Sequence, residues 1–161
     1  YLEMIRLKTS VLLACSLKAG AILAEAHEDM ANLMYEIGIN LGMAFQIQDD
    51  YLDTFGNESN TGKAVGGDIR ANKKTYLFLK AFEKANAQQT EKLHTLVAAN
   101  SQEKVQETIS LYRDLDIDKS ALDLIAYYFQ NVEKGIAQLQ MPEEQKEEMN
   151  KLLHLLINRE K

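Results

Sequence analysis

The longest amphipathic stretch of the chain covers residues 29–56 and reads DMANLMYEIGINLGMAFQIQDDYLDTFG. Its apolar side chains recur at the spacing of one helix face. Asp29 suits the N-cap of a helix, and Gly56 suits the residue that follows a helix end. The sequence therefore predicts one helix of roughly 27 residues, which is longer than the usual helix of a globular protein.

Helical periodicity also runs through further stretches on both sides of this one. They cover residues 2–23, 73–84, 89–98, 102–115, 119–140 and 142–158. Pro142 suits the first position of the last helix, whereas clustered Asn and Gly residues at 57–72 predict a loop. Because no strand pattern, repeat or domain boundary is found, the sequence predicts a single all-helical array over residues 1–161.

The composition limits the classes of protein that the chain can belong to. Its 161 residues make about one domain, and its formal net charge of −6 argues against nucleic-acid binding by overall charge. No apolar run is long enough for a transmembrane helix, and the single cysteine, Cys15, allows no internal disulfide. These features favour a cytoplasmic protein. Since Tyr1 leads directly into an amphipathic pattern without a signal peptide, we expect a fragment.

Three carboxylates interrupt the apolar pattern near the end of the long predicted helix. Around a helix Asp49 and Asp53 lie about 40° apart, and Asp50 and Asp53 about 60° apart. Gln46 precedes Asp49 by one turn on the same face. Like charges at this spacing repel, and Mg²⁺ is a natural compensating cation because it prefers carboxylate and phosphate oxygens. The alternative is a solvated acidic face, which is common on protein surfaces.

A locally basic stretch follows this acidic cluster. Between residues 61 and 76 the basic side chains outnumber the one carboxylate, Asp68; they are Lys63, Arg70, Lys73 and Lys74. Glycines in the same stretch permit close backbone approach, and lysine ammonium groups suit phosphate oxygens. The alternative is a flexible surface loop with solvated lysines.

Short motifs occur along the chain in a fixed order. They are Lys8-Thr9, FQIQDDYLD at residues 45–53, Thr61-Gly62-Lys63, Gly67-Asp68-Ile69 and Asn72-Lys73-Lys74-Thr75. Together they closely resemble the second half of a trans-isoprenyl diphosphate synthase, the polyprenyl synthetase family that includes geranyl, farnesyl and geranylgeranyl diphosphate synthases. The resemblance covers most of the chain, and the stretch at 45–53 followed by Thr-Gly-Lys is highly specific to this family.

The resemblance implies an isoprenoid-synthase-type antiparallel helical bundle that forms a homodimer. It also implies a prenyltransferase of the geranyltranstransferase type, which condenses isopentenyl diphosphate with an allylic prenyl diphosphate and uses Mg²⁺. The implied metal ligands are Asp49, Asp50, Asp53 and Asp68. The implied diphosphate ligands are Lys8, Lys63 and Lys73. The implied catalytic residues are Lys8, Thr9, Gln46 and Asp49.

The chain also departs from the family pattern. Residues 1–161 contain neither a second aspartate-rich motif nor the paired arginines that the family places upstream of the matching region. We therefore expect these residues to be the C-terminal portion of one all-helical prenyl synthase domain and to be inactive alone. The alternatives are a non-catalytic partner subunit of a prenyl synthase and an inactive helical scaffold.

Overall fold

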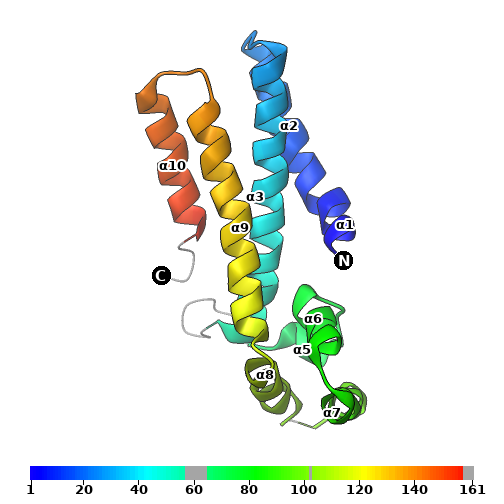
Figure 1. Ribbon diagram of the computed structural model, residues 1–161. Coiled ribbons are helices and arrows are strands. Elements are labelled where there is room, and N and C mark those ends of the chain that lie inside the picture. Colours follow the sequence, from blue (N-terminus) through cyan, green and yellow to red (C-terminus); the bar gives the residue numbers. More distant parts are fainter. Residues whose placement is uncertain (57–64, 102, 158–161) are drawn as a thin grey trace. The chain divides into compact units, whose positions relative to one another are not determined.

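The computed structural model describes residues 1–56, 65–101 and 103–157, and these residues form helices joined by turns, with no strand among them. In chain order the helices are α1 (Leu2–Ile5), η1 (Arg6–Ser10), α2 (Val11–Leu23), α3 (Glu28–Phe55), α5 (Gly67–Arg70), α6 (Tyr76–Lys84), α7 (Ala87–Ala98), α8 (Lys104–Asp114), α9 (Ile117–Gln138) and α10 (Glu143–Ile157) (Figure 1). The all-α prediction is confirmed for this part of the chain. A helix that could span a membrane is not found in these ranges.

The first predicted helix, residues 2–23, has a local change of pitch. The backbone stays in the right-handed helical region at Ile5 and at Val11, so α1, η1 and α2 form one continuous run. Between them η1 is a five-residue π-helical turn. Short π-helical turns of this kind are frequent at functional sites, and this one carries Lys8 and Thr9.

The prediction of a loop at residues 57–72 is wrong in part, because Gly67–Arg70 form the short helix α5. Residues 57–64 lie outside the described residues. The next helix, α6, starts later than predicted because the Thr75 hydroxyl caps it, accepting a hydrogen bond from the N–H of Phe78 at 3.3 Å. Helix α10 likewise starts after Pro142, whose carbonyl accepts a hydrogen bond from Gln145.

The chain divides into two compact units. Unit 1 comprises Tyr1 and Ile47–Asp123. Unit 2 comprises Leu2–Gln46 and the described residues from Leu124 onward. Each unit is held together by different contacts.

In unit 2 glycines allow α3 to approach the first helical run closely. A Cβ atom on Gly38 would lie 2.4 Å from the Cα of Ala14, and one on Gly42 would lie 2.6 Å from the Cα of Ser10. Real Cβ atoms do not come this near to a backbone atom. The two helices therefore pack backbone against backbone at both positions.

Helix α9 also packs on α3 within unit 2 (Figure 1). A Cβ atom on Gly135 would lie 2.6 Å from the Cγ1 of Ile37. The side-chain amide of Asn131 donates a hydrogen bond to the Oδ1 of Asn40 at 3.2 Å. Small residues and one polar pair thus set the contact between these two helices.

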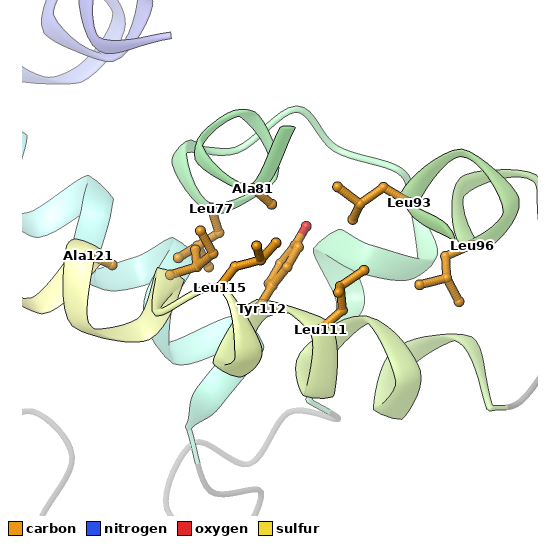
Figure 2. Close-up of a cluster of buried hydrophobic side chains, with 9 residues drawn as sticks. Leu77, Ala81, Leu93, Leu96, Leu111, Tyr112, Leu115 and Ala121 are labelled. Carbon is orange, nitrogen blue, oxygen red and sulfur yellow. The ribbon is translucent and has the colours of Figure 1, made fainter. Parts of the chain in front are cut away.

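Unit 1 is built around an apolar cluster contributed by α6, α7, α8 and the start of α9 (Figure 2). Its members are Leu77, Ala81, Leu93, Leu96, Leu111, Tyr112, Leu115, Ile117 and Ala121. Tyr51 and Phe55, on the last two turns of α3, pack against this cluster. Burial of apolar area is the main stabilising contribution here, and it fixes the end of α3 that carries the aspartates.

Candidate functional site

The three motif aspartates lie in the last turns of α3 and differ in exposure. Asp49 is exposed, Asp53 is partly buried, and Asp50 is buried with only 1% of its surface exposed. This order follows from helical geometry, because residues one position apart point in directions about 100° apart. The three carboxylates of the motif therefore lie in three different environments, which the sequence pattern alone does not show.

Asp50 accepts a hydrogen bond from the hydroxyl of Tyr1. Burial raises the pKa of the Asp50 carboxyl above its ordinary value, and the hydrogen bond from Tyr1 and the charge of Lys73 offset only part of this effect. Burial, followed by the hydrogen bond to Asp50, raises the pKa of the Tyr1 hydroxyl, so this hydroxyl stays protonated as the donor. Tyr1 is a site residue that the sequence analysis missed.

Asp53 holds the start of the segment that contains α5. Its Oδ2 accepts a hydrogen bond from the N–H of Asp68 at 2.8 Å, and its backbone carbonyl accepts one from Gly66 at 2.6 Å. A Cβ atom on Gly67 would lie 3.0 Å from the Oδ1 of Asp53, so a side chain there would crowd the carboxylate. Burial raises the pKa of Asp53 above its ordinary value, although the hydrogen bond from Asp68 acts the other way.

A tight turn after α5 brings Lys73 back onto Asp68. Asn72 has a left-handed backbone with φ of 51°, and its N–H donates to the carbonyl of Ile69 at 3.1 Å. The N–H of Lys73 donates to the carbonyl of Asp68 at 2.9 Å, which completes a Schellman motif. The Lys73 ammonium then reaches both carboxylate oxygens of Asp68, at 3.0 and 3.1 Å.

Lys73 supplies positive charge to the aspartates of unit 1. Burial opposes its charge, but the hydrogen bond with Asp68 and the charges of Asp68, Asp50 and Asp53 outweigh burial and raise the pKa of Lys73. The structure therefore joins two of the predicted metal ligands, Asp53 and Asp68, to one of the predicted diphosphate ligands, Lys73. The arrangement presents an ammonium group beside carboxylates, which suits phosphate and a hard cation at the same place.

The carboxylates fit a divalent cation in chemistry but are not gathered as a ligand set. Among the described residues, no group of three or more His, Cys, Asp or Glu side chains is arranged to hold a metal ion. Burial first, and then the charge of Asp68, raise the pKa values of Asp50 and Asp53, and the donor type and this repulsion both favour a cation. Binding of Mg²⁺ by Asp49, Asp50, Asp53 and Asp68 thus stays a prediction.

The remaining predicted catalytic residues belong to unit 2. Lys8 is exposed and Thr9 is partly buried, both on the π-helical turn η1. The Thr9 hydroxyl donates a long hydrogen bond to the Oε1 of Gln46 at 3.4 Å, so these two predicted residues are paired. Lys63, the third predicted diphosphate ligand, lies outside the described residues.

The described residues form an all-helical fold, in which the long helix α3 ends in Asp49-Asp50-x-x-Asp53 and is followed by the Asp68–Lys73 pair. The chain belongs to the polyprenyl synthetase family, which its residues 1–115 match. It is 32% identical over its whole length to the geranylfarnesyl diphosphate synthase of Aeropyrum pernix, of which the match covers 50%.

Solved structures confirm the predicted isoprenoid-synthase-type helical fold. A geranylgeranyl pyrophosphate synthase is 40% identical, with a TM-score of 0.87 over 100% of this chain and 51% of the other. A polyprenyl synthase from Caulobacter crescentus, complexed with calcium and isoprenyl diphosphate, is 27% identical, with a TM-score of 0.88 over 100% of this chain and 49% of the other. The chain thus spans about half the length, or less, of the relatives that it matches.

Proposed function

We propose that the protein is a trans-prenyl diphosphate synthase that condenses isopentenyl diphosphate with an allylic prenyl diphosphate. The observation that carries this proposal is the assembly of Asp53, Asp68 and Lys73 at the end of α3. Membership of the polyprenyl synthetase family supports the class of substrate. The geranylgeranyl and geranylfarnesyl synthases among the relatives support an isoprenoid product without fixing its chain length.

The proposed reaction gives each described residue of the site a role. Lys8 and Lys73, together with Lys63, would bind the oxygens of the allylic diphosphate by charge-assisted hydrogen bonds. Such contacts stabilise the charge that develops on the leaving group as its bond to carbon breaks. Thr9 and Gln46 form one polar pair that would line the allylic chain and receive the departing proton on its way to the released diphosphate, which is the base. Electrostatic stabilisation therefore carries most of the catalysis.

The proposed cofactor is Mg²⁺, with Asp49 as the principal ligand and Asp50, Asp53 and Asp68 in support. When bound, Mg²⁺ neutralises negative charge on the diphosphate. Lys73, whose ammonium contacts both carboxylate oxygens of Asp68, would donate to the diphosphate oxygens beside that carboxylate. The calcium in the Caulobacter crescentus complex supports a divalent cation in a relative of this chain.

A condensation assay tests the proposal. The natural-length protein that carries residues 1–161 is incubated with Mg²⁺, labelled isopentenyl diphosphate and geranyl diphosphate, with EDTA in a parallel sample. We expect labelled prenyl diphosphate only in the sample with Mg²⁺. Absence of product from a folded protein that binds pyrophosphate would instead favour the non-catalytic partner subunit.

Two further expectations follow from the same proposal. The protein would act as a homodimer, which sedimentation of the natural-length protein measures directly. Residues 1–161 would form the C-terminal portion of its domain and would not condense the substrates alone. The condensation assay on these residues alone measures that, and turnover above a sample without protein would contradict it.

A further inference from the structure

A buried lysine lies under the segment that carries Asp68 and Lys73. Lys104, the first residue of α8, is only 5% exposed. Its ammonium donates to the Oδ1 of Asn72 at 2.7 Å and to the backbone carbonyl of Val97 at 3.2 Å. Both of these acceptors are neutral. A lysine is almost never buried this fully unless its charge has a partner, so its burial here indicates a specific role.

The contact with Asn72 falls on the residue that reverses the chain. Asn72 has the left-handed conformation that closes the Schellman motif, and this conformation is unfavourable for most residues other than glycine. Asn72 is an exposed residue, but its side-chain oxygen accepts the hydrogen bond from the buried Lys104. This hydrogen bond therefore holds the Asn72 side chain in place. Through the turn, the position of Asn72 determines where Lys73 meets Asp68.

The same end of α8 also supports the start of the segment. Gly66 has a left-handed backbone with φ of 82°, and a Cβ atom there would lie 2.3 Å from the Cγ1 of Val105. Lys104 and Val105 are adjacent, so one helical turn contacts both ends of the stretch from Gly66 to Asn72. A cavity of about 20 Å³ beside it, lined by Lys104, Asp68 and Lys73 among others, has room for about one water molecule.

We propose that Lys104 is a positioning residue of the candidate diphosphate site, which acts by holding Asn72 in the conformation that places Lys73 beside Asp68. The inference rests on the proposed function, since it concerns the segment that would bind diphosphate. Lys104 does not touch the substrate in this account.

Four variants of the natural-length protein isolate this contact. Lys104→Met removes the ammonium and keeps the length of the side chain. Asn72→Gly removes Oδ1 but adopts the left-handed backbone without support, and the double variant combines the two changes. The control is Lys146→Met in unit 2, because Lys146 is 16% exposed and also donates to a backbone carbonyl, that of Ala137 at 3.3 Å.

Binding of inorganic pyrophosphate in the presence of Mg²⁺ is measured by calorimetry, and the KM for geranyl diphosphate and the kcat are measured in the condensation assay. We expect Lys104→Met to weaken pyrophosphate binding and to raise KM about tenfold, with kcat changed less than about threefold. Asn72→Gly should stay near the wild type, because glycine adopts the left-handed conformation without support. The double variant should also stay near the wild type, because glycine at this position makes the contact with Lys104 unnecessary. Lys146→Met should resemble the wild type.

Hydrogen exchange without ligand separates this inference from the proposed function. The amides of Ala71, Asn72 and Lys73 donate hydrogen bonds inside the turn, and their exchange should accelerate in Lys104→Met but not in Asn72→Gly or the double variant. If the wild type binds no pyrophosphate, the proposed function fails, and exchange still tests the positioning role. Unchanged exchange in Lys104→Met would overturn the inference, as would equal acceleration in Lys104→Met and the double variant. If Lys104→Met does not fold, recovery of folding in the double variant would support the inference, and failure of both to fold would overturn it.

Discussion

The two groups of predicted site residues are built by different physical means. In unit 1, hydrogen bonds and an ion pair hold Asp53, Asp68 and Lys73 together. In unit 2, Thr9 and Gln46 meet because glycines let two helix backbones approach closely. The first group is therefore sensitive to charge, and the second is sensitive to volume. Variants that change only one of these properties distinguish the two groups.

The largest expected effect comes from filling the close approach in unit 2. In Gly38→Ala the new Cβ would lie 2.4 Å from the Cα of Ala14, and this backbone atom cannot move aside cheaply. We expect the free energy of unfolding to fall by about 3 kcal/mol, as measured by denaturant titration.

Gly20→Ala is the matched control for that variant. Gly20 also lies within a helix, α2, but nothing lies within 4 Å of a Cβ placed there. The better helix propensity of alanine should raise the free energy of unfolding by about 0.5–1 kcal/mol. Equal losses of stability in the two variants would contradict close packing as the basis of this contact.

The second effect comes from removing charge in unit 1. In Asp49→Ala the exposed carboxylate that is proposed to bind Mg²⁺ is lost. We expect kcat of the natural-length protein to fall by about 10²-fold or more, since groups that stabilise developing charge contribute several kcal/mol. Asp114→Ala, which removes a carboxylate at the end of α8, is the control and should leave kcat unchanged. Turnover of Asp49→Ala within twofold of the wild type would remove Asp49 from the site.

A smaller effect is expected at Ser10, beside the glycine contact. Its hydroxyl is buried and has no hydrogen-bond partner. Ser10→Ala removes the unsatisfied group without adding volume, so stability should rise by about 1 kcal/mol. Thermal unfolding measures this change. A loss of stability would show that the hydroxyl has a favourable contact.

The smallest expected effect is a dependence on pH at Asp50. Its folded-state pKa is raised above the ordinary value of 3.8 because of burial, so the folded protein binds this proton more tightly than the unfolded chain does. The ionised carboxylate therefore destabilises the fold at neutral pH, and this contribution shrinks as the pH falls through the folded pKa and is gone below the ordinary value of 3.8. Asp50→Asn should unfold at a higher temperature than the wild type near neutral pH, with a gap that narrows in acid.

The control for the dependence on pH is Asp116, whose shift has the opposite sign. The hydrogen bond from Lys119 lowers the pKa of the exposed Asp116 carboxyl. Asp116→Asn should therefore bring no gain in unfolding temperature at neutral pH. A gain of the same size in Asp116→Asn and Asp50→Asn would show that burial is not the cause.

The sequence predicted the long helix well, because periodicity and end signals depend only on neighbouring residues. Helix α3, Glu28–Phe55, ends next to Gly56 as expected, but it starts before Asp29, which lies in its first turn and is not its N-cap. The π-helical turn η1 was not predictable in this way, because an apolar pattern does not show one extra residue in a turn. Helix α5 was missed because Asn72 ends it after a single turn, and its surroundings resemble a loop.

The site was predicted as a set of residue types but not as a set of contacts. The motif indicated Asp53 and Asp68, whereas their hydrogen bond joins residues that are fifteen positions apart and depends on the fold. One feature of the sequence could have indicated a role for Lys104. It shares a helix face with the buried Thr108 and Leu111, so a charged residue stands where the pattern of α8 requires an apolar one.

The most direct test of the account is a calorimetric titration of the natural-length protein with inorganic pyrophosphate, with and without Mg²⁺. The account predicts binding that requires Mg²⁺ and weakens about tenfold or more in Lys73→Met. Binding should stay at the wild-type level in Lys119→Met, where an exposed lysine paired with Asp116 is lost instead. Equal binding in the absence of Mg²⁺, or wild-type affinity in Lys73→Met, would contradict a diphosphate site built from Asp68 and Lys73.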